Sequence, residues 1–152
     1  MARRRIFLTF AALAVMAMIL FFSTQNSRAS EQTSGYLVDW LIDRFLPQFD
    51  VWPLARQLQT HQAWQFVVRK CAHFTEYALL GLALTPLVHS YGARRGWLWS
   101  WLLATALAAL DETLQYLGGT RSGVARDVVL DSFGALCGAG VWMLLRRLRR
   151  HR

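Results

Sequence analysis

The chain has 152 residues, of which 55% are hydrophobic and 17% are charged, and its length suits a single domain. Soluble domains usually carry about a quarter of their residues as charges, and the high apolar content excludes a disordered chain. Two cysteines are too few for a disulfide scaffold. The net charge of +8 is compatible with nucleic-acid binding, but the positions of the charges along the chain argue against that class.

Four apolar stretches approach the length of about 20 helical residues that a bilayer core requires. The predicted spans cover residues 6–22, 68–88, 97–116 and 126–145. The first span follows three arginines and lacks a clear cleavage site, so we predict an uncleaved anchor in preference to a cleaved signal peptide. Pro86 is expected to kink or end the second span. The predicted fold class is all-α, an integral membrane bundle of four transmembrane helices in one domain over residues 1–152.

The basic residues are distributed unevenly between the two sides of the predicted membrane. Ten of the 17 basic residues, and none of the nine acidic residues, lie at the termini or in the loop between the second and third spans. Because short loops rich in lysine and arginine stay on the cytoplasmic side, we predict that both termini are cytoplasmic. The positive charge is then mainly a topology signal. Membrane lipid is the expected partner and nucleic acid is not; contact of the basic C-terminal tail with anionic lipid headgroups is an alternative.

The first outer loop, about residues 23–67, contains two apolar patterns with helical spacing. One runs from Leu37 to Phe45, and the other from Val51 to Leu58, with Pro53 suited to a first helical turn. We predict two short amphipathic helices in this loop. They either cover the ends of the bundle or gate a substrate or dock a partner.

Ionisable side chains are unusually frequent near the ends of three predicted spans. Such side chains are costly in a membrane and usually face the protein interior, where they have a function. The predicted topology brings the start of the second span, the end of the third and the start of the fourth to the same outer third of the membrane. We therefore predict a polar pocket there. Its residues are Lys70, His73, Glu76, Tyr77, Asp111, Glu112, Gln115, Arg121, Asp127 and Asp131.

Alternatives remain open for this polar set. A buried salt-bridge network could fix the register of the helices without a substrate, although buried ion pairs are weak net stabilisers. Lys70, or the neighbouring Arg126, could instead extend to the lipid headgroups. Gly134 and Gly138 form a G-x-x-x-G pattern that predicts close helix packing, within the chain in preference to a second copy. The oligomeric state stays open.

The motifs of the chain resemble those of VanZ-like membrane proteins, in the same order. Residues 69–81 are similar to the R-K-x-x-H-F-x-E-Y-x-x-L-G signature, and residues 111–115 to the D-E-x-x-Q motif. Residues 121–138 resemble the block R-S/T-G…D-x-x-x-N/D-x-x-G-x-x-x-G, with Asp131 where many members carry Asn. Residues 22–25 resemble the F-x-S-x-Q motif that ends the first span of the family.

The resemblance implies a bacterial cytoplasmic membrane protein of the cell envelope. The family is named for a protein linked to resistance to the glycopeptide teicoplanin in Gram-positive bacteria, and its biochemical mechanism is unsettled. An antibiotic-resistance role is therefore an implication of the family name and not of the residues.

Two function classes compete for the polar pocket. In the first, a non-enzymatic protein binds or shields a lipid-linked or cell-wall ligand, with Arg121, Lys70 and His73 meeting its phosphate or carboxylate. In the second, an intramembrane hydrolase or transferase uses His73 or Glu76 as a general base. In that case three carboxylates could hold a divalent cation, namely Glu76, Asp111 and Asp127. Ion passage is disfavoured, because the inner halves of the spans are apolar. Catalytic residues, metal and cofactor stay unassigned.

Overall fold

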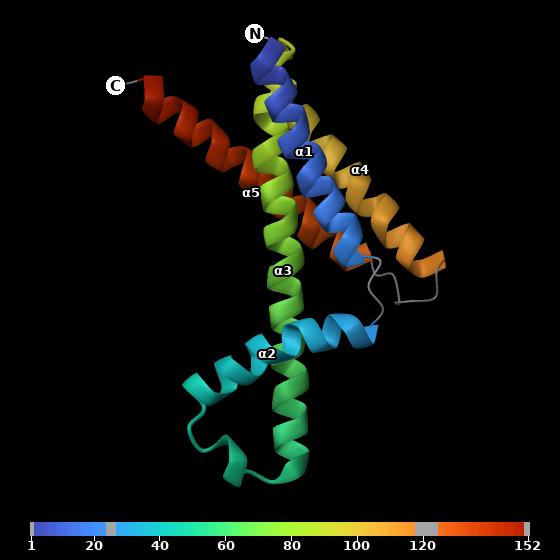
Figure 1. The fold of residues 1–152 in the computed structure, drawn as a ribbon, viewed down its shortest axis with the longest axis vertical. Coiled ribbons are helices and arrows are strands. Elements are labelled where there is room, and N and C mark those ends of the chain that lie inside the picture. The colour runs from blue at the N-terminus through green and yellow to red at the C-terminus, as the bar shows by residue number, and fades with distance from the viewer. Residues whose placement is uncertain (1, 24–26, 118–124, 151–152) are drawn as a thin grey trace. The chain divides into compact units, whose positions relative to one another are not determined.

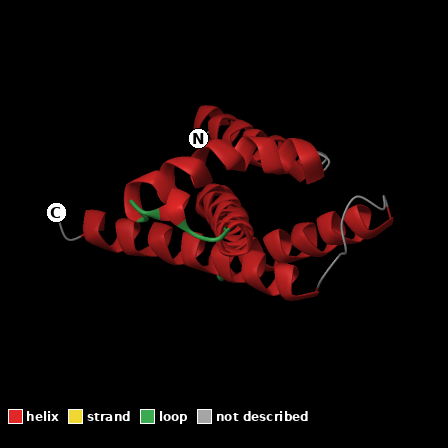
Figure 2. Ribbon diagram, turned by 90° about the horizontal axis from the view of Figure 1, so that it is seen from below, coloured by secondary structure: helices red, strands yellow, loops and turns green. Residues whose placement is uncertain are grey.

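The computed structural model describes residues 2–23, 27–117 and 125–150, and these form helices with no strand among them (Figure 2). The elements in chain order are α1 (Ala2–Ser23), α2 (Ser27–Phe45), the 3₁₀ helix η1 (Phe49–Val51), α3 (Leu54–Ser90), α4 (Gly96–Leu117) and α5 (Ala125–Arg150). The expected all-α class is confirmed.

The chain divides into two compact units, which are described separately. The first, here called the bundle, comprises residues 1–24 and 73–152, and the second, here called the loop unit, comprises residues 25–72. The division falls within α3, whose first part belongs to the loop unit and whose second part belongs to the bundle.

The bundle packs α1, the second part of α3, α4 and α5 around a core of mostly small and aliphatic side chains, of which Tyr77 is the largest. The buried core residues are Ala12, Ile19, Tyr77, Leu80, Leu84, Ala104, Ala108 and Ala135. Large apolar side chains point outwards instead, and Phe7 of α1 is 71% exposed. Small residues inside and large apolar residues outside are typical of helices that contact each other in lipid, where close approach of the backbones provides the packing energy.

Helices α3 and α5 approach each other closely in the bundle. A Cβ atom added to Gly138 would lie 1.9 Å from the carbonyl oxygen of Ala78, and one added to Gly81 would lie 2.1 Å from that of Ala135. At Gly134 the corresponding distance, to the carbonyl oxygen of Phe74, is 2.5 Å. These separations are shorter than any side-chain carbon tolerates, so only glycine fits at the three positions.

Three helices are long and apolar enough to cross a membrane by length and composition: α1, α3 and α5. The chain is therefore a multi-pass helical membrane protein. α4 has 22 residues but falls outside this set, because its tryptophans and its polar end at Asp111 and Glu112 lower its mean hydropathy. Pro86 does not end α3, which continues to Ser90.

The loop unit is built from α2, η1 and the first part of α3. α2 buries Val38 and Ile42. It is also joined to α3 by polar contacts: Ser34 Oγ donates to Gln65 Oε1 at 2.6 Å, and His61 Nε2 lies 3.1 Å from Asp39 Oδ1.

One expectation for this loop is wrong. α2 contains the first apolar pattern, but the second forms no separate short helix, because Leu54–Ser90 is one continuous helix. The residues between Leu58 and the predicted start of the span at residue 68 contain no proline or glycine, so nothing interrupts the helix. Pro53 directly precedes its first turn, where the missing N–H has no cost.

Candidate functional site

Three helices of the bundle carry the polar residues predicted from the sequence. They are His73, Glu76 and Tyr77 on α3, Asp111, Glu112 and Gln115 on α4, and Asp127 and Asp131 on α5. α4 ends and α5 begins at the same end of the bundle, and α1 also ends there (Figure 1). We call this the acidic end, because five of the eight residues are carboxylates.

Ser23 at the end of α1 is bonded to α4. Its Oγ donates to Asp111 Oδ1 and accepts a hydrogen bond of 2.9 Å from Gln115 Nε2. Gln115 Nε2 also donates to Asp111 Oδ2 at 3.1 Å, within one turn of α4. Asp111 and Gln115 are each only 5% exposed, so this three-residue network satisfies polar groups that would otherwise be costly. Ser23 is not among the site residues predicted from the sequence, although it lies within the segment that resembles the F-x-S-x-Q motif.

Tyr77 and Asp131 lie in the interior of the acidic end. Tyr77 is completely buried and Asp131 is 4% exposed. Within the described part of the chain, neither the Tyr77 hydroxyl nor Asp131 Oδ1 has a hydrogen-bond partner. Buried polar groups are nearly always paired, so two such atoms in one place call for an explanation.

Carboxylates surround this unpaired set. Glu76, Asp111 and Glu112 interact electrostatically with both Tyr77 and Asp131, and Asp127 interacts with Asp131. Residues from α3, α4 and α5 that are distant in sequence are therefore close together in space. The interior of the acidic end therefore combines a phenolic hydroxyl with a cluster of carboxyl groups.

His73 and Glu76 form a second feature of the same end. His73 Nδ1 lies 3.8 Å from Glu76 Oε2, and both side chains are mostly buried. The distance is an ion-pair distance and not a hydrogen-bond distance. A carboxylate beside a partly buried histidine is an arrangement in which the histidine can exchange a proton.

The predicted cations are less closely tied to the site than the carboxylates. Arg121 lies outside the described residues. Lys70 belongs to the loop unit, where its Nζ lies 5.3 Å from the centre of the Phe66 ring. Arg126 is exposed and forms no ion pair with any residue that the structure describes.

The geometry gives no support to the divalent-cation hypothesis. In the described ranges, no three histidine, cysteine, aspartate or glutamate side chains are arranged to hold a metal ion.

A further polar contact, which the sequence did not indicate, joins α4 to α5. Trp101 Nε1 donates to Ser132 Oγ at 2.9 Å, and Thr105 Oγ1 lies 2.8 Å from the same oxygen. No charge or motif distinguishes these residues in the sequence, and their pairing follows only from the packing of the two helices.

Comparison with known proteins identifies a protein family. The family model described as VanZ/LLP1 matches residues 8–146. No curated protein and no solved structure matches the chain. The matched residues include most of α1 and α5, all of α3 and α4, and every residue of the acidic end. The chain therefore belongs to the VanZ/LLP1 family.

Proposed function

We propose that α4 crosses the membrane together with α1, α3 and α5, so that the whole chain acts as one four-span domain. α4 contributes Ala104 and Ala108 to the bundle core, and its 22 residues are long enough to span. With four spans and the arginine distribution, both termini are cytoplasmic and the acidic end faces outwards. The family supports a location in the bacterial cytoplasmic membrane.

We further propose that the acidic end binds, and so shields, a lipid-linked or cell-envelope ligand. The observation that carries this proposal is the pair of unpaired buried atoms, the Tyr77 hydroxyl and Asp131 Oδ1. An unpaired buried polar group costs about 1–3 kcal/mol, and a ligand that pairs it recovers this free energy on binding. A structural network alone would have its members paired.

The chemistry of the two atoms indicates which part of a ligand they contact. A phenolic hydroxyl can donate and a carboxylate accepts, so the complementary group both accepts and donates, as sugar hydroxyls and amides do. The surrounding carboxylates disfavour a phosphate at this depth.

Binding to a lipid-linked peptidoglycan precursor in nanodiscs tests the proposal. Tyr77→Phe and Asp131→Asn should each weaken binding about tenfold, the effect of losing one hydrogen bond of about 1.4 kcal/mol. Ser100→Ala is the matched control, since Ser100 is equally buried but its hydroxyl already donates to the carbonyl oxygen of Gly96 at 2.7 Å. Unchanged binding in both site variants, or equal loss in the control, would contradict the proposal.

An intramembrane hydrolase or transferase is the second candidate, and the His73–Glu76 pair at 3.8 Å favours it. In this function, His73 accepts a proton from a nucleophile and Glu76 stabilises the resulting imidazolium. His73→Gln and Glu76→Gln should then abolish turnover of an envelope lipid while leaving its binding largely intact. Full cellular activity in both variants would contradict the enzymatic function.

A further inference from the structure

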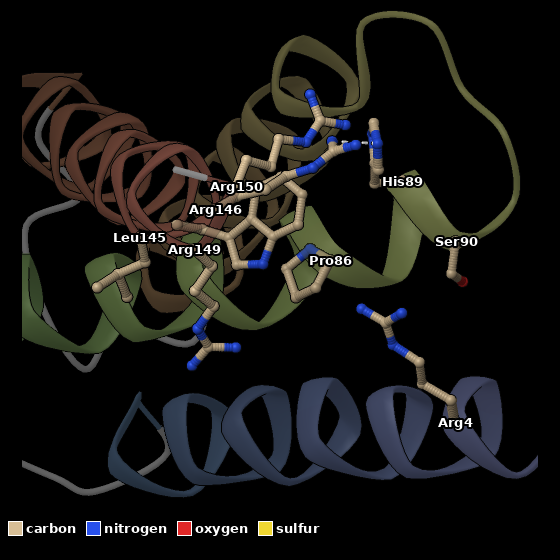
Figure 3. A pocket seen from close by; sticks show the side chains of 9 residues that line it. Arg4, Pro86, His89, Ser90, Leu145, Arg146, Arg149 and Arg150 are labelled. Atoms are coloured by element: carbon tan, nitrogen blue, oxygen red, sulfur yellow. Dashed lines mark hydrogen bonds between the residues drawn. The ribbon is translucent and has the colours of Figure 1, made fainter. Parts of the chain in front are cut away.

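The end of the bundle opposite the acidic end contains a cavity of about 380 Å³. Helices α1, α3 and α5 line it, and Figure 3 shows Arg4 extending from α1 and Arg149 from α5 towards it. The lining residues are Arg4, Pro86, His89, Ser90, Trp142, Leu145, Arg146, Arg149 and Arg150. We call this the basic cavity.

The charges around the basic cavity are all of one sign. Four arginines line it and no carboxylate does. None of the four forms an ion pair with a carboxylate in the described part of the chain. Arginines gathered in this way repel one another, and a bound anion relieves the repulsion. Guanidinium groups suit phosphate in particular, because their donors match two of its oxygens at once.

Neighbouring contacts hold parts of the cavity wall in place. Arg146 donates to Nε2 of His89, so that nitrogen acts as an acceptor, and the Arg146 guanidinium also lies 5.3 Å from the centre of the Trp142 ring. Arg5 donates to the carbonyl oxygen of Ser90 at 2.8 Å, which joins α1 to the end of α3. A site built from three tied helices is preorganised, whereas a free basic tail is not.

The surface beside the cavity is apolar. Val141, Leu144, Leu145 and Leu148 follow helical spacing along α5, and each is between 45% and 57% exposed. Leu145 belongs both to this stripe and to the cavity wall. A ligand that covers both surfaces carries an anionic head and an apolar chain.

We propose that the basic cavity binds the phosphate headgroup of an anionic membrane phospholipid. The acyl chain of this lipid lies along the exposed apolar stripe of α5 that begins at Val141 and ends at Leu148. Basic cavities between transmembrane helices on the cytoplasmic side are suited to such headgroups. The cavity volume lies within the range of small-molecule sites. This site is independent of the function proposed for the acidic end.

Native mass spectrometry of the full chain, released from nanodiscs of phosphatidylglycerol and phosphatidylcholine, tests the proposal. We expect phosphatidylglycerol to be retained preferentially, and Arg4→Gln/Arg149→Gln to lower its affinity about 30-fold, since each basic residue near an anionic headgroup contributes to binding. The matched control is Arg3→Gln/Arg95→Gln. It removes the same charge from two exposed arginines that do not line the cavity.

Each outcome decides the matter. Equal losses in the two double variants would show diffuse attraction to the membrane surface and overturn the site. Equal retention of the two lipids, or displacement of the lipid by inorganic phosphate, would overturn the phospholipid as ligand. Arg4→Lys/Arg149→Lys keeps the charge and the topology signal, so a loss of about fivefold in this variant supports bidentate recognition. Wild-type affinity in the glutamine variant contradicts the proposal.

Discussion

The two ends of the bundle differ in charge and in how their polar groups are satisfied. At the acidic end, carboxylates from three helices surround a buried tyrosine, and part of the set is closed by the Ser23–Asp111–Gln115 network. At the basic end, arginines from α1 and α5 share a cavity with no carboxylate in its wall. The apolar core between them separates two opposite potentials. In the topology and functions proposed above, this charge segregation sets the orientation in the membrane, and the two ends bind ligands of different chemistry.

The largest expected effect comes from the helix contact that holds the two ends together. Gly138→Ala places a Cβ 1.9 Å from the carbonyl oxygen of Ala78, so α3 and α5 must separate. We expect a loss of about 3 kcal/mol in the free energy of unfolding, and weaker ligand binding at both ends. Denaturation in mixed micelles measures the change.

Gly140→Ala on the same helix is the control for this variant. Nothing lies within 4 Å of a Cβ at Gly140, so alanine should raise stability by about 0.5–1 kcal/mol through lower backbone entropy of the unfolded chain. Similar stability of the two variants would contradict the close packing of α3 and α5.

A smaller loss of stability, confined to the acidic end, is expected for a variant of Ser23. Ser23→Ala removes the donor to Asp111 and the acceptor for Gln115, so each of these two buried groups loses one hydrogen bond. We expect a loss of about 1–2 kcal/mol in stability, with phospholipid retention at the basic cavity unchanged. Thr113→Ala is the control on α4, because its exposed hydroxyl bonds only to the carbonyl oxygen of Ala109. Loss of phospholipid in Ser23→Ala would show that the two ends are coupled.

The smallest effect is expected at Arg126. It is exposed and unpaired among the described residues, so Arg126→Gln should change stability by less than about 0.5 kcal/mol. Binding of the lipid-linked precursor should stay within twofold of the wild type. A large loss of binding would contradict this prediction and identify Arg126 as the positive charge that balances the carboxylates of the acidic end.

The sequence predicts the bundle better than it predicts the loop unit. Long apolar stretches and costly polar residues at their ends carry a strong signal, and glycine at positions 134 and 138 indicates close packing. The apolar pattern from Val51 to Leu58 was predicted to form a separate helix. An apolar pattern alone does not show whether its helix continues into the following apolar stretch. The division of α3 between two units depends on tertiary contacts that no local pattern contains.

The candidate site, like the fold, is predicted only in part by the sequence. The carboxylates could be predicted as site residues because charged groups are costly in apolar helices. Ser23, Trp101 and Ser132 are ordinary residues in such helices, so the sequence does not distinguish them. The sequence also could not show that Asp111 is paired while Tyr77 and Asp131 Oδ1 are not, since pairing depends on distances of a few ångströms.

A paired measurement on Tyr77→Phe tests the central claim most directly. The stability of the empty protein and its affinity for the lipid-linked precursor are determined for the same preparation. Because the buried hydroxyl has no partner within the described chain, its removal should leave stability equal or about 1 kcal/mol higher, while affinity falls about tenfold. Lower stability with unchanged affinity would instead identify Tyr77 as part of a structural network and contradict a ligand site at the acidic end.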